Sequence, residues 1–296
     1  MKDTDAMNVL FGTDQQFLPH LATALFSLLH NNSNENIRVY VLHRDIGAHE
    51  WSKLTSLMHE NESVELISVK VGDRDVAAFP TNGRLNESAY FRLLAQELLP
   101  VDKCLYLDSD LIVRGPIRPL YDTEIGDVHV AAAENPGFAG HEELGMPAGA
   151  SYFNSGVMLC NLAMWRQNDL RGRAVRYAQE YRLRIRHADQ DVLNGVLQGA
   201  YRRLDDRYNW RRWAAQSQHY GTTQEEPVIV HFVGAMKPWN LNSDHPYKQE
   251  YWRYRSATPF RRIVADDFSL LTVLKKIYRV SVKKFYSWIR KSEDLR

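Results

Sequence analysis

The segment from Cys104 to Val113 reads CLYLDSDLIV and places two aspartates inside a run of apolar and β-branched residues. Such a run is typical of a buried β-strand. Two ionised carboxylates are costly in apolar surroundings unless a cation compensates them. In an extended chain alternate side chains face the same side, so Asp108 and Asp110 would point together. The pair therefore indicates a divalent-cation site able to carry a diphosphate; the alternative is a strand that ends in an acidic turn.

Strand-like and helix-like patterns alternate through the first half of the chain. Strand-like runs lie at 8–12, 37–42, 64–71 and 128–133, and helical patterns lie at 21–29, 50–59 and 87–99. This order predicts an α/β fold with a mostly parallel central sheet covered by helices on both faces. In such sheets ligands bind at the carboxyl ends of the strands, where Asp108 and Asp110 are placed. The second half is less regular, with an apolar run at 152–162, helical patterns at 170–181 and 190–197, and a β-rich run at 227–233.

The composition is that of a globular protein. A length of 296 residues and a formal charge of +1 favour one large domain, alone or with an appendage. The two cysteines, Cys104 and Cys160, lie in apolar runs and form neither a disulfide framework nor a zinc motif. Asp3 and Asp5 precede no long apolar stretch, so we expect no signal peptide, no membrane span and a cytoplasmic protein. P-loop enzymes and dinucleotide oxidoreductases are disfavoured, because Gly-Lys-Ser/Thr and a complete Gly-x-Gly-x-x-Gly are missing.

Positive charge is concentrated towards residue 296. Residues 261–296 contain ten Lys or Arg and four Asp or Glu, a charge of +6, which leaves −5 for the rest of the chain. At helical spacing one face of this tail is apolar, with Leu271, Leu274, Tyr278, Val282, Phe285 and Ile289. The flank and opposite face are basic, with Lys275, Lys276, Arg279, Lys283, Lys284, Arg290 and Lys291. A basic amphipathic helix that also carries Tyr286 and Trp288 favours an anionic membrane surface. The alternative is a helix docked on the rest of the protein.

His231 is the candidate for a third metal ligand, at the start of the segment HFVGAMKPW, residues 231–239. One imidazole with two carboxylates favours Mn²⁺ over Ca²⁺ and suits Mn²⁺ better than Mg²⁺. Gly234 would let the backbone approach a phosphate, and Lys237 would supply positive charge for it. The alternatives are a core histidine and a solvated lysine.

The loop after the first strand-like run carries Gly12, Thr13 and Asp14. Asp14 could accept a hydrogen bond from a uracil N–H or a ribose hydroxyl, with Phe17 near enough to stack on a base. The alternative is an aspartate that caps a helix and a phenylalanine of the core.

Three further polar groups lie in apolar surroundings. They are Asn154-Ser155-Gly156, Asp189-Gln190-Asp191 and Arg92. Asp189 and Gln190 could bind sugar hydroxyls or lie below an anomeric carbon, whose transition state carries positive charge. Arg92 could balance the carboxylates. The alternatives are a helix cap for Asp189 and an exposed helical arginine.

Six short segments, in order, resemble glycosyltransferase family 8, especially the bacterial lipopolysaccharide galactosyl- and glucosyltransferases. The segments are FGTD at 11–14, YFRL at 90–93, LYLDSD at 105–110, YFNSGV at 152–157, DQDVLN at 189–194 and HFVGAMKPW at 231–239. They span about the first 240 residues. The resemblance implies a GT-A fold, which we assign to residues 1–257. The basic amphipathic helical tail inferred above from charge and periodicity then occupies residues 258–296.

The resemblance also implies a UDP-sugar donor and a role for each matched residue. Asp108, Asp110 and His231 would bind Mn²⁺, or alternatively Mg²⁺, and with it the diphosphate. The uridine, the phosphates and the donor sugar would be held by Gly12, Thr13, Asp14, Gln16, Phe17, Ser109, Gly234, Lys237, Arg92, Asn154, Asp189 and Gln190. Glu134 stands where family members often have Asp for a sugar contact, and Gln16 stands where acidic residues and Asn are common.

These inferences predict a hexosyltransferase that moves galactose or glucose, with retention, to a lipopolysaccharide or related surface glycan. Front-face attack is favoured over double displacement because Gln190 is an uncharged amide and a poor nucleophile. We expect the oligosaccharide or lipid-linked acceptor at the inner face of the cytoplasmic membrane, and no nucleic-acid partner. Two other functions are open: a non-catalytic carbohydrate- or nucleotide-sugar-binding module, which should lose a metal ligand, and a metal phosphohydrolase, which should carry further acid clusters.

Overall fold

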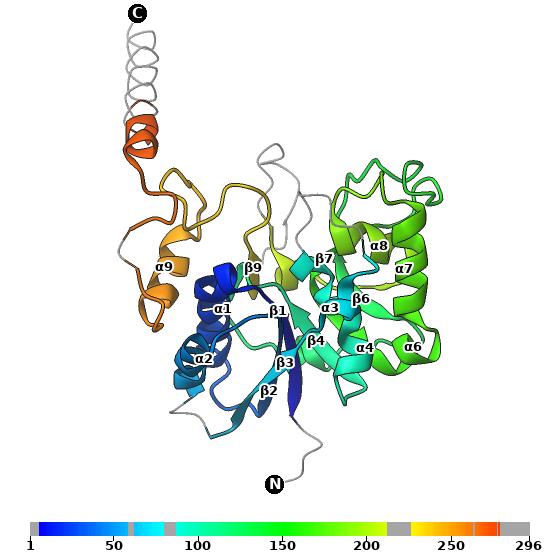
Figure 1. Cartoon of the computed structure of the whole chain (residues 1–296), viewed down its shortest axis with the longest axis horizontal. Coiled ribbons are helices and arrows are strands. Elements are labelled where there is room, and N and C mark those ends of the chain that lie inside the picture. The colour runs from blue at the N-terminus through cyan, green and yellow to red at the C-terminus, as the bar shows by residue number, and fades with distance from the viewer. Residues whose placement is uncertain are drawn as a thin grey trace, which may run out of the picture.

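The computed structural model describes residues 6–58, 62–79, 87–211, 226–262, 264–276 and 278. These residues form a central sheet with helices on both of its faces (Figure 1). The order of its seven strands is β3-β2-β1-β4-β7-β6-β8. Their bounds are β1 Met7–Gly12, β2 Ile37–His43, β3 Val64–Lys70, β4 Lys103–Leu107, β6 Val130–Glu134, β7 Phe153–Asn161 and β8 Arg202–Arg203.

Only one strand of the seven runs against the others. β7 pairs antiparallel with β4 and with β6, and the remaining pairs are parallel. A separate antiparallel pair joins β5, Leu111–Val113, to β9, Ile229–His231. The prediction of an α/β fold with a mostly parallel central sheet is confirmed.

Helices connect and cover the strands. The α-helices are α1 Leu18–His30, α2 Ala48–Thr55, α3 Asp73–Val76, α4 Ala95–Leu98, α5 Arg118–Tyr121, α6 Leu162–Gln167, α7 Leu170–Glu180, α8 Ala188–Leu197 and α9 Lys248–Ser256. The 3₁₀-helices are η1 Gln15–Phe17, η2 Ser56–Met58, η3 Glu87–Leu94 and η4 Asp206–Asn209. None of the helices among the described residues is both long enough and apolar enough to cross a lipid bilayer.

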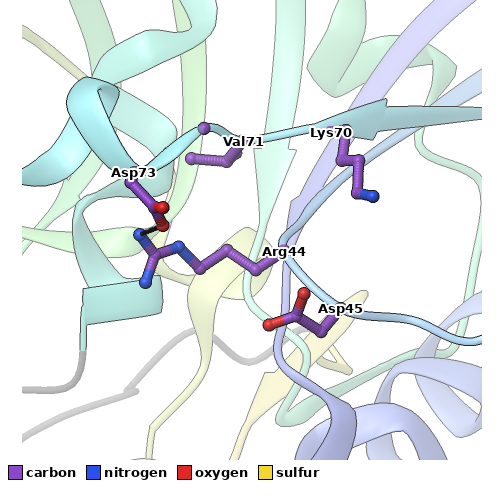
Figure 2. Close-up of a pocket in the computed structure, with 6 residues that line it drawn as sticks. Arg44, Asp45, Lys70, Val71 and Asp73 are labelled. Atoms are coloured by element: carbon purple, nitrogen blue, oxygen red, sulfur yellow. Dashed lines mark hydrogen bonds and ion pairs between the residues drawn. The ribbon is translucent and has the colours of Figure 1, made fainter.

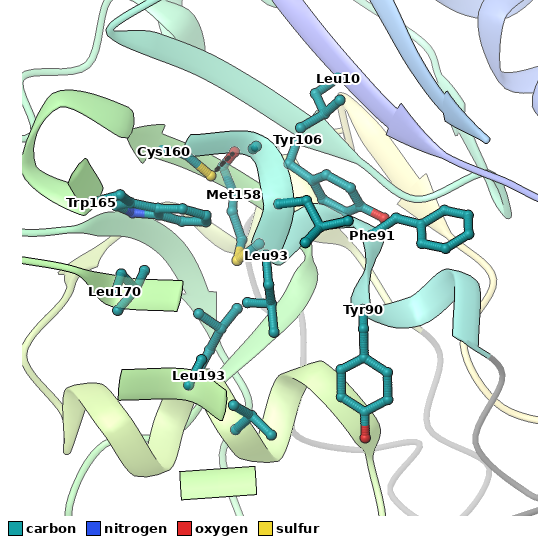
Figure 3. Packing of buried hydrophobic residues seen from close by; sticks show 14 of the residues in the cluster. Leu10, Tyr90, Phe91, Leu93, Tyr106, Met158, Cys160, Trp165, Leu170 and Leu193 are labelled. Carbon is teal, nitrogen blue, oxygen red and sulfur yellow. Dashed lines mark hydrogen bonds between the residues drawn. The ribbon is translucent and has the colours of Figure 1, made fainter. Parts of the chain in front are cut away.

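Alternate residues of the strands divide the apolar core into two halves. On one face of the sheet Leu10, Tyr106 and Met158 pack with side chains of η3, α6, α7 and α8 (Figure 3). On the other face Val9 and Leu105 pack against α1 and α5. This alternation is the expected consequence of the two-residue period of a strand. Because each face has its own helical layer, the inner strands β2, β1, β4, β7 and β6 are mostly buried, whereas the edge strands β3 and β8 have no buried residue.

Two local features add detail to the sequence predictions. The helical pattern at 87–99 forms the 3₁₀-helix η3 and then the short α4. In η3 every residue from Tyr90 to Leu94 is buried, and Arg92 Nη2 lies 2.8 Å from Asp108 Oδ1. The apolar run at 104–113 is not one strand, because the chain bends at Asp108–Asp110 between β4 and β5.

A buried histidine joins α1 to the C-terminal part of the fold. The ring of His20 stacks on Trp239 with centroids 3.6 Å apart, and its Nδ1 lies 2.7 Å from the hydroxyl of Tyr251. Burial and the Arg255 guanidinium lower the pKa of His20 to about 4, although Asp266 favours the protonated ring. The imidazole is therefore neutral in the folded protein near neutral pH.

This histidine should make the fold sensitive to acid. In the unfolded chain it takes up a proton near its ordinary pKa of 6.5, whereas the folded protein resists protonation down to about pH 4. Protonation of His20 therefore favours the unfolded chain between these pH values. The stability contributed by the neutral His20 ring is fully present above pH 6.5 and is lost as the pH falls towards 4. One pKa unit corresponds to about 1.4 kcal/mol, so we expect a loss of roughly 3 kcal/mol in the free energy of unfolding.

Denaturant unfolding at several pH values tests this expectation. His20→Gln should flatten the dependence on pH between 6.5 and 4, and His49→Gln, which changes an exposed histidine of α2, should not. Equal slopes in wild type and His20→Gln would contradict the assignment.

Candidate active site

Three potential metal ligands meet at the junction of the two sheets. Asp108 and Asp110 lie in the bend between β4 and β5, and His231 ends β9, which pairs with β5 so that Leu111 opposes His231. The Nε2 atom of His231 is 3.5 Å from Asp108 Oδ2 and 3.3 Å from Asp110 Oδ1. One ligand atom from each residue lies within 4.8 Å of the others. The structure thus brings together all three residues that the sequence predicted as metal ligands.

The side-chain space for this cluster is provided by Gly156 of β7. A Cβ atom at this position would lie 2.1 Å from His231 Cε1 and 2.6 Å from Asp108 Oδ2, far inside van der Waals contact. The backbone of Gly156 also holds the start of the bend, because Asp108 N–H donates to Gly156 O at 2.8 Å. Two carboxylates and one imidazole whose ligand atoms lie within 4.8 Å of one another fit a divalent cation.

Asp108 and Asp189 share one buried arginine. Arg92, which is 5% exposed, places Nη2 2.8 Å from Asp108 Oδ1 and Nε 3.1 Å from Asp189 Oδ2. Burial opposes the charged guanidinium, but the two carboxylates win and the pKa of Arg92 is raised. The expectation that Arg92 balances the carboxylates agrees with this geometry, and the reading as an exposed helical arginine does not.

Asp110 has a different cationic partner. Lys237 Nζ donates to Asp110 Oδ2 at 2.5 Å and to the carbonyl of Phe232 at 2.6 Å. Burial opposes ionisation of Asp110, but Lys237 and His231 hold its pKa well below the usual range. Lys237 is therefore not a solvated lysine, and it reaches the edge of the ligand cluster.

Asp189 lies inside the first turn of α8 and is not its cap, which is His187. Burial raises the pKa of Asp189 to about 6 against the opposing charge of Arg92. Among the residues that the structure describes, its buried Oδ2 is paired with Arg92 Nε at 3.1 Å but accepts no hydrogen bond, because the Nε hydrogen is donated to the carbonyl of Ala89.

Two amides next to Asp189 are bonded to each other. Asn154 Nδ2 donates to Gln190 Oε1 at 2.8 Å, and Asn154 Oδ1 accepts from the N–H of Gly156 at 3.1 Å. The predicted catalytic residues Asn154, Asp189 and Gln190 thus lie on β7 and α8, alongside Gly156 and the ligand cluster.

The predicted uridine residues lie at the carboxyl end of β1. Asp14 caps η1, with Oδ1 accepting from the N–H groups of Gln16 at 2.9 Å and Phe17 at 3.0 Å. Asp14 therefore caps a helix through Oδ1, as the alternative reading expected. Phe17 is 36% exposed and is not a core residue. The loop adjoins the aspartate bend, because Ser109 Oγ donates to Gly12 O at 3.2 Å. Thr13, between Gly12 and Asp14 in the sequence, is buried.

Glu134 and Gly234 have no described contact with the ligand cluster. Glu134, at the end of β6, pairs with Arg203 Nη1 at 2.7 Å. Gly234 adopts φ +79°, and a Cβ there would meet nothing within 4 Å. Its left-handed backbone conformation is the reason for glycine at this position.

Sequence reasoning missed Asn209. This residue of η4 is 1% exposed, and its Oδ1 lies 3.0 Å from Nδ1 of His231. It therefore orients the imidazole from behind. No motif marks it: it lies in the segment DRYN, 22 residues before His231.

A hollow of about 310 Å³ lies at the same edge of the sheet, beyond β2 and β3. Figure 2 shows Arg44 reaching across it to Asp73, with Asp45 and Lys70 at its rim. Arg44 donates to Asp73 at 2.5 Å and to Glu87 at 2.7 Å, so its charge is already compensated. None of the sequence-predicted site residues lines this hollow.

Gly156→Ala tests the geometry of the cluster. The new methyl group must displace His231 or Asp108, so we expect Mn²⁺ affinity to fall by about tenfold or more, and unfolding free energy to fall by about 1–3 kcal/mol from overpacking. Calorimetric titration with Mn²⁺ and denaturant unfolding measure the two effects. Gly115→Ala is the control, since its Cβ would meet only Val228 at ordinary distances of 3.7 and 3.9 Å. Unchanged Mn²⁺ affinity in Gly156→Ala would contradict this placement of the cation.

Known proteins with similar sequences and structures include several glycosyltransferases. Over 284 residues the chain is 28% identical to General stress protein A of Bacillus subtilis, covering 89% of this chain and 98% of that protein. It is 27% identical to the lipopolysaccharide glucosyltransferase WaaO of Escherichia coli, covering 86% and 79%. The structure of the galactosyltransferase LgtC in complex with donor and acceptor sugar analogues matches with a TM-score of 0.77 and 25% identity, over 87% of this chain and 98% of LgtC.

The resemblance in the six segments is confirmed over most of the chain. Residues 8–243 match the sequence profile of glycosyl transferase family 8. This range contains every predicted site residue, from Gly12 to Lys237. The fold with its mostly parallel sheet likewise matches the GT-A type of LgtC. The chain therefore belongs to glycosyl transferase family 8.

Proposed function

We propose that this protein transfers galactose or glucose from a UDP-sugar to a saccharide acceptor, with retention of configuration at the anomeric carbon. The observation that carries the proposal is the convergence of Asp108, Asp110 and His231 on one point beside Lys237. A diphosphate with its cation needs hard oxygen ligands on one side and a positive side chain on the other. The cluster supplies both at the carboxyl end of β4, where α/β folds bind nucleotides.

The proposed donor lies along this edge of the sheet. The uridine would lie against Gly12, Thr13, Asp14, Gln16 and Phe17, where the partly exposed ring of Phe17 is available for stacking. Ser109 fixes that loop to the aspartate bend. Gly234 and Lys237 would approach the phosphates, and Arg92, Asn154, Asp189 and Gln190 would surround the sugar, with Glu134 farther along the same edge.

Asp108, Asp110 and His231 would hold the cation, and Mn²⁺ suits this donor set better than Mg²⁺. When bound, it would neutralise the negative charge that develops on the leaving UDP. Lys237 contributes positive charge to the same leaving group. Gly156 keeps the space open, and Asn209 orients the imidazole.

Retention is proposed to proceed by attack on the same face as the leaving group. Asp189 is buried beside Arg92, and its carboxylate would stabilise an oxocarbenium-like sugar. Gln190 is an amide held by Asn154 and positions the sugar without forming a bond to it. The leaving phosphate accepts the proton of the acceptor hydroxyl. A covalent sugar adduct on Asp189 would indicate double displacement instead.

The acceptor is proposed to be a lipopolysaccharide or related surface glycan. Relatives support this class: WaaO is a lipopolysaccharide glucosyltransferase, and another relative, from Salmonella typhimurium, is a lipopolysaccharide 1,3-galactosyltransferase. A non-catalytic binding module of this fold is disfavoured because the ligand cluster is complete. A phosphohydrolase leaves the pairing of Asn154 and Gln190 beside the cluster without a role.

A screen of UDP-sugars with Mn²⁺ tests the proposal, scored by UDP release with and without core oligosaccharide. We expect UDP-galactose or UDP-glucose to be consumed faster with the acceptor, and the product linkage to keep the donor's anomeric configuration in NMR spectra. Asp110→Ala should abolish Mn²⁺-dependent turnover, because it removes one ligand and the partner of Lys237, while the circular-dichroism spectrum stays native. Donor hydrolysis with every acceptor and no glycan product would favour the phosphohydrolase, and full activity of Asp110→Ala would contradict the metal assignment.

The tail at 258–296 is proposed to bind an anionic membrane surface at the cytoplasmic face, next to the catalytic domain at 1–257. The described start of the tail supports this role. The backbone is helical over 270–276, and Leu270, Leu271, Leu274 and Tyr278 are more than half exposed. The rest of the proposed apolar face, at Val282, Phe285 and Ile289, lies outside the described residues.

The root of the tail contacts the catalytic domain. Asp266 N–H donates to Trp239 O at 3.0 Å, and Leu241 N–H donates to Asp267 Oδ1 at 2.7 Å. Arg255 also pairs with Asp266 at 3.1 Å. A truncation that keeps residues 1–267 therefore preserves these contacts.

Removal of residues 268–296 should prevent sedimentation with vesicles containing anionic phosphatidylserine or phosphatidylglycerol. Activity on a soluble oligosaccharide should remain, because no proposed site residue is removed. The control is full-length protein with neutral phosphatidylcholine vesicles, on which we expect weak binding, since each basic residue near an anionic surface contributes about 1 kcal/mol. Sedimentation of the truncated protein with anionic vesicles would defeat the proposal.

A further inference from the structure

A line of hydrogen-bonded side chains leads from the candidate cation site into the core. It connects, in order, His231, Asn209, Asn154, Gln190, Tyr152 and Asp191. The successive distances are 3.0, 2.9, 2.8, 3.1 and 2.5 Å. Gln190 is half-buried and the other five are buried. Each contact therefore lies where an unmade hydrogen bond is costly.

The direction of this line is fixed at its inner end. A carboxylate accepts hydrogen bonds and donates none. Asp191 Oδ2 accepts from the N–H groups of Arg186 at 2.7 Å and His187 at 2.8 Å, and Oδ1 lies 2.5 Å from the Tyr152 hydroxyl. The hydroxyl must therefore donate to Asp191, and its oxygen is left to accept from the amide of Gln190.

Two backbone N–H groups fix the amides in the same sense. Ser155 N–H donates to Gln190 Oε1 at 3.3 Å, and Gly156 N–H donates to Asn154 Oδ1 at 3.1 Å. Because a backbone N–H is always a donor, these contacts identify the amide oxygens without reference to the side-chain network. The NH₂ group of Asn154 then faces Gln190, and its oxygen faces the NH₂ group of Asn209.

The outer end of the line follows from these assignments. Once Asn209 donates through Nδ2 to Asn154, it presents Oδ1 to His231. An oxygen acceptor there requires the hydrogen of the neutral imidazole to lie on Nδ1. The lone pair of Nε2 is then directed at Asp108 and Asp110, 3.3 to 3.5 Å away.

We propose that Asp191 and Tyr152 act through this line, with Asn209 as the last positioning residue, to hold His231 in the Nδ1–H tautomer that ligates a cation through Nε2. The proposal rests on the proposed cation site and adds residues that touch neither the cation nor the donor. It also joins two parts of the site, because Asn154 and Gln190, proposed to face the sugar, are members of the line. The orientation of the metal ligand and of the sugar-facing amides is thus set together.

The tautomer can be measured in the metal-free protein. In protein labelled with ¹⁵N-histidine, long-range ¹H–¹⁵N spectra at pH 8 separate a protonated ring nitrogen from an unprotonated one. The signals of His231 are identified by their loss in His231→Gln. We expect Nδ1 to be protonated and Nε2 to be unprotonated in wild type. Asn209→Ala and Tyr152→Phe should shift part of the population to the Nε2–H tautomer.

Direct titration with Mn²⁺ gives a second readout. Asn209→Ala should weaken Mn²⁺ binding by about 10–100-fold, the range for partners that orient a ligating histidine. Tyr152→Phe should weaken it in the same direction but less, because its ring and its stacking on Phe138 are retained. Tyr121→Phe is the matched control: it removes a buried tyrosine hydroxyl that accepts from Asn8 at 3.2 Å, outside the line, and should change neither readout.

The outcomes separate this inference from the proposed function. An Nε2–H tautomer in wild type would overturn the inference, and so would an unchanged tautomer and Mn²⁺ affinity in folded Asn209→Ala and Tyr152→Phe. A purely structural role would lower the unfolding midpoint of the variants while leaving the tautomer in place. Wild type could also show the Nδ1–H tautomer, and the variants lose it, while wild type fails to bind Mn²⁺. That result would count against the proposed cation site alone.

Discussion

The compensation of buried negative charge is the constraint on which this site depends. The carboxylates of Asp108, Asp110 and Asp189 lie near one another. Asp189 is buried and the other two are half-buried, so an unpaired charge there is costly. Arg92 compensates two of them from η3, and Lys237 compensates the third from the loop after β9. Removing one partner of such a buried pair costs about 3–5 kcal/mol, because the other charge is left uncompensated. The charges therefore fix the positions of η3 and of the loop after β9 around the aspartate bend.

A glycine and neutral amides also determine the geometry of the site. Gly156 leaves the space into which Asp108 and His231 converge, and β7, which carries it, is the one strand that runs against its neighbours. Because β7 enters from the opposite direction, Asn154 and Gly156 of its first residues lie at the carboxyl end of β4. Behind them Asn209 joins His231 to Asn154. A strand of the usual direction would deliver its last residues here, so the reversal determines which part of β7 meets the site.

Sequence patterns predicted the order of strands and helices and most of the site, because both depend on local periodicity and on residue types that are costly to bury. The pairing of Asp108 and Asp110 with His231 followed from ligand chemistry together with the family resemblance, and the structure brings these residues together. The break in the run at 104–113 was not predictable, because β5 separates from β4 only by pairing with a strand more than a hundred residues away. For the same reason Asn209 carried no signal: its role is defined by contacts across the fold.

The pairing of β5 with β9 also determines when in folding the cluster can exist. Asp108 and His231 are separated by about 120 residues, and the entropy of closing a loop of that length must be overcome before their contacts contribute any stability. The two aspartates lie between β4 and β5 in sequence, yet the imidazole reaches them only after β9 has docked on β5. The ligand cluster is thus among the long-range contacts that local structure cannot form by itself, and a nascent or partly folded chain holds the two acids without their third partner.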